Sequence, residues 1–193
     1  MRDKNIIGER IMVLGPSASG KSTLAHQLGQ ITGINVIHLD RLFWNPGWVE
    51  TPSEEMDQKV INAASEDRWI IDGNYFRTLQ FRMERASSVV YIDFNRYFCI
   101  FRAIKRWIGN YGKTRWDLGD DCLEKIDLEF LSWIWNYPKR SRSKVLEMIS
   151  LFGNNSNNGV YILKSRKDVR AFKEITARHY SKQANYNNIH DTL

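Results

Sequence analysis

The sequence predicts an α/β fold: a three-layer sandwich in which helices cover both faces of a five-stranded parallel sheet. Two observations favour it. Five short apolar runs, most of them rich in β-branched or aromatic residues and ending at Gly or Asp, have the composition of strands buried on both faces. Helical patterns separate these runs, and strands that alternate with helices pair in parallel. The chain has 193 residues, which suits one domain with a substantial core.

The expected strands are residues 11–14, 36–39, 69–71, 89–92 and 160–163. A helix over residues 22–30 follows the first strand. It places Leu24, Ala25 and Leu28 on one side, and glycines mark its end.

Two capping boxes predict further helix starts. Thr51-Pro52-Ser53-Glu54 combines a Thr cap and a Glu three residues later with proline at the first helical position. Ser165-Arg166-Lys167-Asp168 has a similar pattern directly after the fifth strand. We therefore expect one helix before the third strand and another after the fifth.

Residues 96–152 interrupt this alternation. We expect a first helix with two arginines on one face, and a turn at residues 109–112. An apolar helix over residues 123–137, stopped by Pro138, and a shorter helix over residues 143–152 follow. The simplest interpretation is an insertion of helices between the fourth and fifth strands.

The domain organisation and compartment follow from composition. We expect one domain over residues 1–180 and a polar, frayed tail over residues 181–193. No apolar run approaches the roughly 20 residues of a membrane span, and the N-terminus has no apolar signal segment. Cys99 and Cys122 form no metal-binding motif. These features predict a reduced, cytoplasmic protein without a membrane partner.

The charge is unevenly distributed. The formal charge of the chain is +6, with a net −2 over residues 1–95 and a net +8 over residues 96–193. Such asymmetry indicates an anionic partner for the second half. Nucleic acid, a membrane headgroup and nucleotide phosphate all qualify at this point.

A phosphate-binding loop follows the first strand. Residues 15–22 fit G-x-x-x-x-G-K-[ST] at every fixed position, between an expected strand and an expected helix. Glycines let backbone N–H groups converge on a phosphate, and the helix N-terminus adds roughly half a positive charge. We expect Lys21 to reach the β- and γ-phosphates and the Ser22 hydroxyl to ligate Mg²⁺. The candidate ATP-binding residues here are Gly15, Pro16, Ser17, Ala18, Ser19, Gly20, Lys21, Ser22 and Thr23.

Asp72 and Asp93 each end an apolar strand, which is where a carboxylate holds Mg²⁺ directly or through water. An ordinary turn or helix cap is the alternative for either residue. We favour Asp72 as the metal-binding partner of Ser22, because it leads directly into a polar loop that contains Asn74 and Arg77.

Asp40 closes the second strand, beside the phosphate loop and at the sheet edge where ligands bind in open α/β folds. A carboxylate there can accept a proton from an acceptor hydroxyl or hold a substrate group; an ordinary structural role is the equal alternative. Arg41 and Trp44 are further candidates for the acceptor pocket, together with Asn74 and Arg77 from the loop after the third strand.

Six basic residues and no acidic residue lie between Arg96 and Trp116. Arg102 and Arg106 are four residues apart and share one helix face. Two guanidinium groups on one face suit a polyphosphate, because they stabilise charge spread over phosphoryl oxygens. The interleaved aromatic residues also fit a nucleic-acid surface, and a solvated basic face is the third interpretation.

The layout resembles the adenylate-kinase-like branch of the P-loop kinases. Residues 69–78 are similar to that family's hydrophobic-Asp-Gly-Phe-Pro-Arg signature, with one extra residue and no proline. Asp93-Phe94, followed by Arg102-x-x-x-Arg106, looks like the stem of the family's lid.

This resemblance implies a strand order of 2-3-1-4-5 and a lid over about residues 107–140. It places Arg102 against the nucleotide, Arg106 on the nucleotide phosphates and Arg77 on an acceptor phosphate. The loop after the fifth strand, which contains Arg166, is expected to overhang the phosphate loop as well.

Over nearly the whole chain, to about residue 175, the sequence is similar to bacterial proteins called DNA topology modulation protein. Residues 38–48, 72–75 and 127–135 carry the similarity. That name implies an effect on DNA supercoiling. The sequence has no context for a nucleophilic tyrosine and no recognised DNA-binding motif, so function is argued from the site.

The sequence therefore predicts a Mg²⁺-dependent, ATP-binding phosphotransferase that resembles nucleoside and nucleotide kinases and phosphorylates a small-molecule acceptor. The expected catalytic residues are Lys21, Asp40, Arg102 and Arg106. The alternatives are a nucleotide-gated nucleic-acid-binding protein that affects DNA topology, and a regulatory ATPase. Nucleic acid is compatible with the sequence but not required by it, and the basic residues left for DNA are Lys139, Arg140, Arg142 and Lys144.

Overall fold

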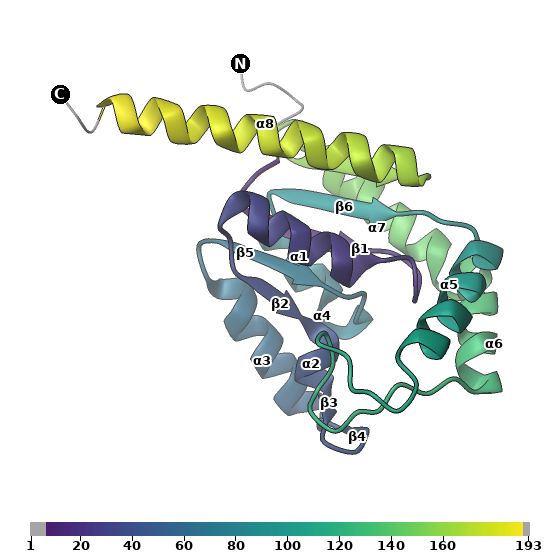
Figure 1. The fold of residues 1–193 in the computed structure, drawn as a ribbon. Coiled ribbons are helices and arrows are strands. Elements are labelled where there is room, and N and C mark those ends of the chain that lie inside the picture. The colour runs from purple at the N-terminus through teal and green to yellow at the C-terminus, as the bar shows by residue number, and fades with distance from the viewer. Residues whose placement is uncertain (1–6, 191–193) are drawn as a thin grey trace.

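The computed structural model describes residues 7–190. Its core is a parallel sheet of five strands, β1 (Arg10–Leu14), β2 (Val36–His38), β5 (Trp69–Asp72), β6 (Ser88–Ile92) and β7 (Gly159–Leu163), seen in Figure 1. The spatial order is β2-β5-β1-β6-β7, with every neighbouring pair parallel. The predicted fold class and the predicted order 2-3-1-4-5 are both confirmed.

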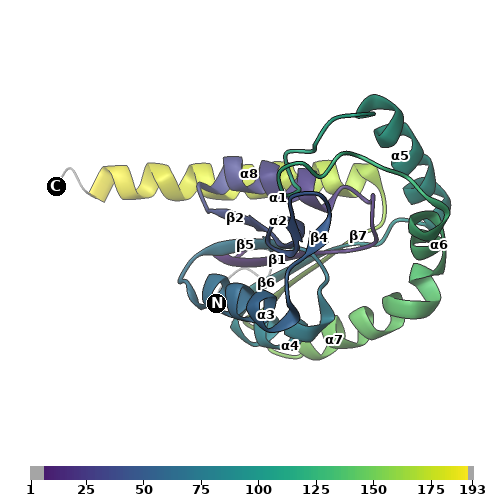
Figure 2. The ribbon, with the colours of Figure 1, turned by 90° about the horizontal axis from the view of Figure 1, so that it is seen from below.

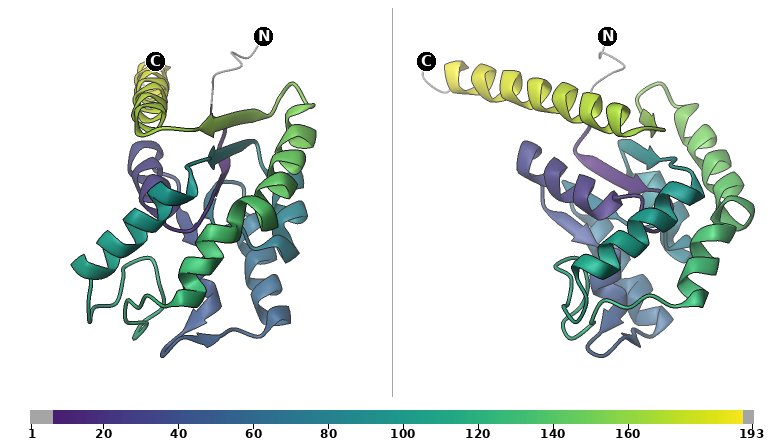
Figure 3. Two further views of the ribbon diagram at one scale, coloured as in Figure 1. Left: turned by 90° about the vertical axis from the view of Figure 1, so that its right-hand side faces the viewer. Right: turned by 45° about the vertical axis from the view of Figure 1, so that its right-hand side comes forward.

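Two apolar clusters separate the helices into layers, as the side views in Figure 3 show. On one face, α1 (Lys21–Thr32) packs beside α8 (Arg166–His190). On the other lie α3 (Ser53–Ser65), α4 (Phe76–Arg85) and α7 (Ser143–Gly153). Because both faces are covered, the central strands are buried along their whole length, which explains their unbroken apolar runs.

The register of the sheet brings three strand ends together. Val13 of β1 lies opposite Asp72 of β5, and Asp72 lies opposite His38 of β2. A short helix, α2 (Leu39–Phe43), follows β2 and leads into a small antiparallel hairpin of β3 (Trp44–Asn45) and β4 (Val49–Glu50). The sequence did not predict this hairpin. It stands at the same edge of the sheet as the phosphate loop.

The insertion consists of α5 (Arg96–Gly109), an irregular segment over residues 110–127 and α6 (Leu128–Tyr137). The α-helix ends at Tyr137, as expected, but Pro138 does not end the helical path of the chain. Pro138 has helical backbone angles and opens a π-helical turn, η1 (Pro138–Arg142), that continues into α7. Figure 2 shows α6, η1 and α7 as one bent helical rod. The apolar helix also begins at Leu128 rather than 123, where the Asp127 carboxylate caps it by accepting from the Phe130 N–H at 2.7 Å.

The two capping boxes have different outcomes. At the start of α8 the Asp168 N–H donates to the Ser165 hydroxyl, and the Ser165 N–H donates to the Asp168 carboxylate, so this box is confirmed. The prediction that Thr51 caps the next helix was wrong. That hydroxyl is buried and donates instead to the carbonyl of Leu42 at 2.8 Å, and α3 begins without a side-chain cap.

The helix α8 continues to His190, beyond the domain end expected at residue 180; residues 191–193, the end of the expected tail, lie outside the described part of the chain. Within residues 7–190, none of the helices combines the length and the apolar character needed to cross a bilayer.

Candidate active site

A cavity of about 840 Å³ opens at the carboxyl ends of β1, β2 and β5. It is the place where ligands bind in open α/β sheets. Most of the residues that the sequence analysis singled out line it. They are Ser17, Ala18, Gly20, Lys21, Ser22, Thr23, Asp40, Trp44, Asp72, Asn74, Arg102 and Arg106.

The phosphate loop turns between β1 and α1 in a conformation that depends on its glycines. Gly15 has a φ of +146° and Gly20 a φ of +99°, values that side chains with a Cβ rarely adopt. A Cβ on Gly15 would lie 2.5 Å from the Ile92 carbonyl oxygen. Lys21 folds back over the loop and donates to the Pro16 carbonyl at 3.1 Å, which keeps its ammonium group at the mouth of the loop.

Arg102 lies across the phosphate loop from α5. Its Nε donates to the Ala18 carbonyl at 3.0 Å, and a Cβ on Gly20 would lie 3.0 Å from its guanidinium nitrogen. Burial, more than the nearby charge of Arg166, lowers the pKa of Arg102. A partly desolvated guanidinium above backbone N–H groups attracts an anion strongly, because few water molecules screen it.

Asn74 fixes the start of the phosphate loop. Its side-chain amide donates to the Gly15 carbonyl at 2.8 Å and accepts from the Gly15 N–H at 3.1 Å. The sequence analysis placed Asn74 among the acceptor-binding residues. In the structure the oxygen and the nitrogen of its amide both bond to the backbone of Gly15, so Asn74 supports the phosphate loop.

Arg82 of α4, which the sequence analysis missed, holds the loop that contains Asn74. It is fully buried and donates to the carbonyls of Gly73, Asn74 and Tyr75 at 2.6–3.0 Å. Burial lowers its pKa to about 9. No local sequence signal distinguishes this arginine from its exposed neighbours on the same helix.

Ser22 and Asp72 offer oxygen ligands that fit Mg²⁺. Asp72 is buried; its Oδ2 lies 3.0 Å from His38 Nδ1, while its Oδ1 has no hydrogen-bond partner among the described residues. Ser22 and Asp72 line the same cavity, and an orphaned buried carboxylate oxygen together with a hydroxyl group suits a hard cation. Asp93, the competing candidate, is engaged elsewhere, since Arg142 donates to both of its oxygens at 2.8 and 2.7 Å.

Asp40 faces the phosphate loop from α2. The Tyr75 hydroxyl donates to its Oδ1 at 2.9 Å. Burial raises the pKa of Asp40 above the usual aspartate value, although the positive charge of Lys21 lowers it in part. A carboxylate with a raised pKa next to a phosphate loop is well placed to accept a proton from a hydroxyl group.

The segment over residues 110–127 contributes a charge network that the sequence analysis did not foresee. Glu124 accepts from Arg106 Nε at 2.9 Å and lies 3.5 Å from Arg115, while Arg115 forms a two-pronged ion pair with Asp117. Burial alone would raise the pKa of Asp117. The positive charge of Arg115 lowers it, and a hydrogen bond from Ser22 lowers it further. Arg106 is therefore held by a carboxylate of the segment that covers the phosphate loop.

The same segment is docked on the hairpin β3–β4, and the two lie side by side in both views of Figure 3. A Cβ on Gly119 would overlap the carbonyl of Trp44, so only glycine fits there. The Trp48 indole N–H donates to the Leu123 carbonyl at 3.0 Å, and the Cys122 thiol lies 3.4 Å from the Asn45 carbonyl. These contacts close the outer side of the cavity.

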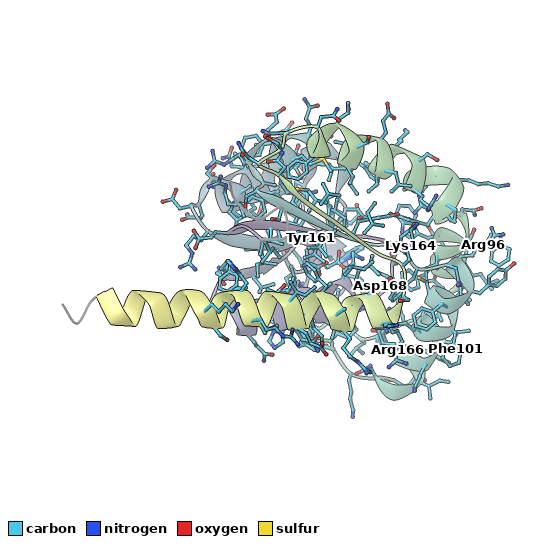
Figure 4. All side chains as sticks on the ribbon, turned by 90° about the horizontal axis from the view of Figure 1, so that it is seen from above. Arg96, Phe101, Tyr161, Lys164, Arg166 and Asp168 are labelled. Carbon is cyan, nitrogen blue, oxygen red and sulfur yellow. The ribbon has the colours of Figure 1, made fainter. Side chains whose placement is uncertain are left out.

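Six of the predicted site residues do not line the large cavity. Gly15, Pro16 and Ser19 belong to the phosphate loop, and the other three are Arg41, Arg77 and Arg166. Arg77 donates to Asp57 at 2.7 Å on the exposed side of α4, and Arg41 is exposed near the Trp116 carbonyl. Arg166 instead lines a smaller cavity of about 170 Å³, enclosed by two segments: Phe94, Asn95 and Phe98 on one side and Lys164, Ser165 and Arg166 on the other. Figure 4 shows Lys164 and Arg166 at the end of α8 that faces α5.

No family model and no curated protein matches the chain, so the resemblance to DNA topology modulation proteins is not confirmed. Among solved structures, a gluconokinase from Sinorhizobium meliloti 1021 is 11% identical over 96% of this chain and 98% of its own, with a TM-score of 0.46. A shikimate kinase from Bacteroides thetaiotaomicron is 17% identical over 86% of this chain and 94% of its own, with a TM-score of 0.45. A sugar kinase from Janibacter sp. HTCC2649 is 14% identical over 89% of this chain and 91% of its own, with a TM-score of 0.41. Likeness at this level leaves the function to be argued from the site.

Proposed function

We propose that this protein is a P-loop phosphotransferase that moves the γ-phosphoryl group of ATP to a hydroxyl group of a small molecule. One observation supports this most: the phosphate loop, two basic side chains and a carboxylate with a raised pKa border one cavity. Those are the parts that phosphoryl transfer requires, since its catalysis consists of positioning and neutralisation of charge. Lys21 and Arg102 neutralise the phosphates, and Asp40 faces the acceptor.

The nucleotide lies along the phosphate loop in this proposal. Backbone N–H groups of residues 17–22, at the N-terminus of α1, bind the β- and γ-phosphates. The smaller cavity next to Arg102 takes the base, with Phe94 and Phe98 beside it and Arg166 at its rim. Arg102 lies between the two cavities, with its guanidinium 5.7 Å from the Phe98 ring.

Ser22 and Asp72 are the residues that would hold Mg²⁺. The ion, when bound, neutralises the charge that develops on the phosphoryl oxygens. The chain itself orients the Asp72 carboxylate through His38, which engages Oδ2 and leaves the buried Oδ1 without a hydrogen-bond partner among the described residues.

The segment over residues 110–127 acts as a lid. It brings Arg106 and Arg115 over the phosphate loop, and its contacts with the hairpin exclude water from the reacting groups. Exclusion of water is needed because a water molecule competes with the acceptor for the phosphoryl group.

The alternative of a DNA-binding protein has less support from these residues. Of the four basic residues left for DNA, Arg142 is paired with Asp93. Arg140 stacks 3.3 Å from the Trp133 ring and also lines the large cavity. Lys139 and Lys144 remain, which is a small basic surface for a polyanion.

The test is a Lys21→Ala variant assayed for transfer from Mg²⁺-ATP to a panel of alcohols. We expect transfer to fall by at least roughly a hundredfold, since one preorganised donor to the transition state is worth that much. The thermal unfolding midpoint should stay unchanged. Lys59→Ala, an exposed lysine paired with Glu55 on α3, is the matched control. Full activity without Lys21 would contradict the proposed function.

A further inference from the structure

We propose that the acceptor is an alcohol without a phosphate group, whose flat or apolar ring lies on an aromatic wall of the large cavity. This inference rests on the proposed function and names the substrate class of the same site. The aromatic wall is defined as Phe43, Trp44, Trp48 and Tyr75, all of which line the cavity.

The aromatic wall is continuous. The ring centroids of Trp48 and Trp44 are 5.2 Å apart, those of Trp44 and Phe43 4.7 Å apart, and those of Phe43 and Tyr75 5.3 Å apart. Each pair is tilted or edge-on, the arrangement that aromatic rings prefer. Such a wall binds flat rings and the apolar faces of sugars through contact area, without requiring charge.

One end of the aromatic wall meets the reacting groups. The Tyr75 hydroxyl binds Asp40, so an alcohol that lies on the wall presents its hydroxyl group to that carboxylate. Tyr75 has a φ of +26° and Trp48 a φ of +65°, both unusual for residues with side chains. Strain of this kind persists where the surrounding structure enforces it, and it is concentrated at binding and catalytic sites.

The charges near the aromatic wall disfavour a phosphate ester. The carboxylates of Asp40, Glu50 and Asp72 line this part of the cavity. The two arginines that the sequence analysis named for the acceptor, Arg77 for its phosphate and Arg41 for its pocket, are both outside it: Arg77 is paired with Asp57, and Arg41 is exposed. A second dianion placed among three carboxylates, with neither arginine present, would be repelled.

Most of the remaining cations of the cavity already have partners. Arg140 lies 3.3 Å from the centre of the Trp133 ring and donates to the Trp133 carbonyl. Arg106 and Arg115 are bound by Glu124 and Asp117. Lys125 lies 4.8 Å above the Trp48 ring, a cation–π contact at the outer rim. Among the described residues that line the cavity, Lys125 is therefore the strongest remaining candidate to bind an anionic group of an acceptor near the aromatic wall.

For an uncharged alcohol, every bond that forms or breaks during phosphoryl transfer can be accounted for. The acceptor oxygen forms a bond to the γ-phosphorus, and the bond between that phosphorus and the β,γ-bridging oxygen breaks. ADP leaves with the electron pair of the broken bond. The proton of the alcohol passes to the Asp40 carboxylate.

The experiment compares matched pairs that differ only in a phosphate group: thymidine with thymidine 5′-monophosphate, and methyl glucoside with glucose 6-phosphate. Binding is measured by calorimetry in the presence of Mg²⁺ and a saturating, non-hydrolysable ATP analogue, so that the nucleotide site is filled. Transfer from ATP is measured in parallel. We expect at least one alcohol to bind, and to bind roughly tenfold or more tightly than its phosphate ester.

Two sets of variants locate the binding. Trp44→Leu should raise the dissociation constant of the alcohol about tenfold or more without changing that of the ATP analogue, and Trp44→Phe should restore most of the binding. Arg77→Ala and Lys125→Ala should leave alcohol binding unchanged. Tighter binding of the phosphate esters, lost in either of those last two variants, would overturn the proposal, as would binding of neither partner. If alcohols bind but no transfer occurs, the proposed function fails while the acceptor class stands.

Discussion

At the scale of single residues, the site depends on polar side chains that link the loop after β5 to its surroundings. Arg82 binds three consecutive carbonyls, Asn74 binds both backbone groups of Gly15, and Tyr75 binds Asp40. Each contact joins the loop after β5 to another part of the site. The geometry of the phosphate loop therefore depends on α4, which touches no ligand in the proposal.

Arg82→Ala should destabilise the protein, because it leaves the carbonyls of Gly73, Asn74 and Tyr75 without their donor. We expect a loss of roughly 2–4 kcal/mol in the free energy of unfolding, measured by urea titration. Arg77→Ala on the same helix is the matched control. Its exposed ion pair with Asp57 should contribute less than about 1 kcal/mol. Equal effects of the two variants would refute the structural role of Arg82.

Asp40→Asn should separate stability from activity. Because burial raises the pKa of Asp40, the folded state holds the proton more tightly than the unfolded state, and ionisation costs folding free energy. That cost is present above the folded pKa and vanishes below the ordinary value of 3.8. The variant should therefore melt at a higher temperature than wild type near pH 7, and the difference should disappear as the pH falls.

Transfer by the same variant should fall by about 10²–10⁴-fold, the usual contribution of a general base. The Asn side chain still accepts a hydrogen bond from Tyr75, so the local structure is kept. A lower melting temperature at neutral pH, or unchanged transfer, would show that Asp40 has only a structural role.

The sequence was sufficient to predict some of the site residues but not others. Residues 15–22 and the strand end at Asp72 were identified because the chemistry of phosphate binding imposes a local pattern. Asp40 does line the cavity, but the expectation that it ends the second strand was wrong, since that strand ends at His38 and Asp40 lies in α2. The partners Arg82, Arg115, Asp117 and Glu124 were not, because their roles depend on contacts between segments. The position of Arg77 was mispredicted for the same reason: only the fold shows that this side of α4 faces solvent.

At the scale of elements, the segment over residues 110–127 and the hairpin β3–β4 act together. The sequence analysis did not predict the hairpin, and for the segment it predicted only a turn at residues 109–112 and the start of a helix at residue 123, which in the structure begins at Leu128. Their docking depends on a close backbone approach at Gly119 and on single hydrogen bonds to carbonyls. The same contacts bring the aromatic wall and the charge network of Arg106 to one cavity.

Gly119→Ala should prevent this docking, because the added Cβ would overlap the Trp44 carbonyl. We expect faster hydrogen exchange over residues 110–127 and a KM for the acceptor raised by about tenfold. Gly109→Ala is the matched control, since a Cβ there meets nothing within 4 Å. If both variants behave like wild type, the segment does not need this contact to close.

At the scale of the whole molecule, the sheet could be predicted well. All five strands and their parallel pairing agree with the expectation, because central strands buried on both faces are apolar throughout. Their order also agrees, and that expectation came from the resemblance to P-loop kinases. The insertion could not be predicted to the same degree. Pro138 continues a helix through a π-turn, since its own missing N–H is tolerated where the hydrogen-bond ladder already shifts.

The whole fold also accounts for the uneven charge. Much of the basic surplus in the second half lies on α5 and at the start of α8, which border the two cavities. A polyphosphate bound at this edge would satisfy that surplus without a nucleic-acid partner. In the proposed function, a basic side of the cavity therefore takes the nucleotide and an acidic and aromatic side takes the acceptor.

The most direct test of this account is the balance of products formed from labelled ATP in the presence of a bound alcohol. Wild-type protein should form ADP and phosphorylated alcohol in equal amounts, with little inorganic phosphate, and Lys21→Ala should form neither. Equal amounts of ADP and inorganic phosphate, with no phosphorylated alcohol, would contradict a phosphotransferase and indicate an ATPase.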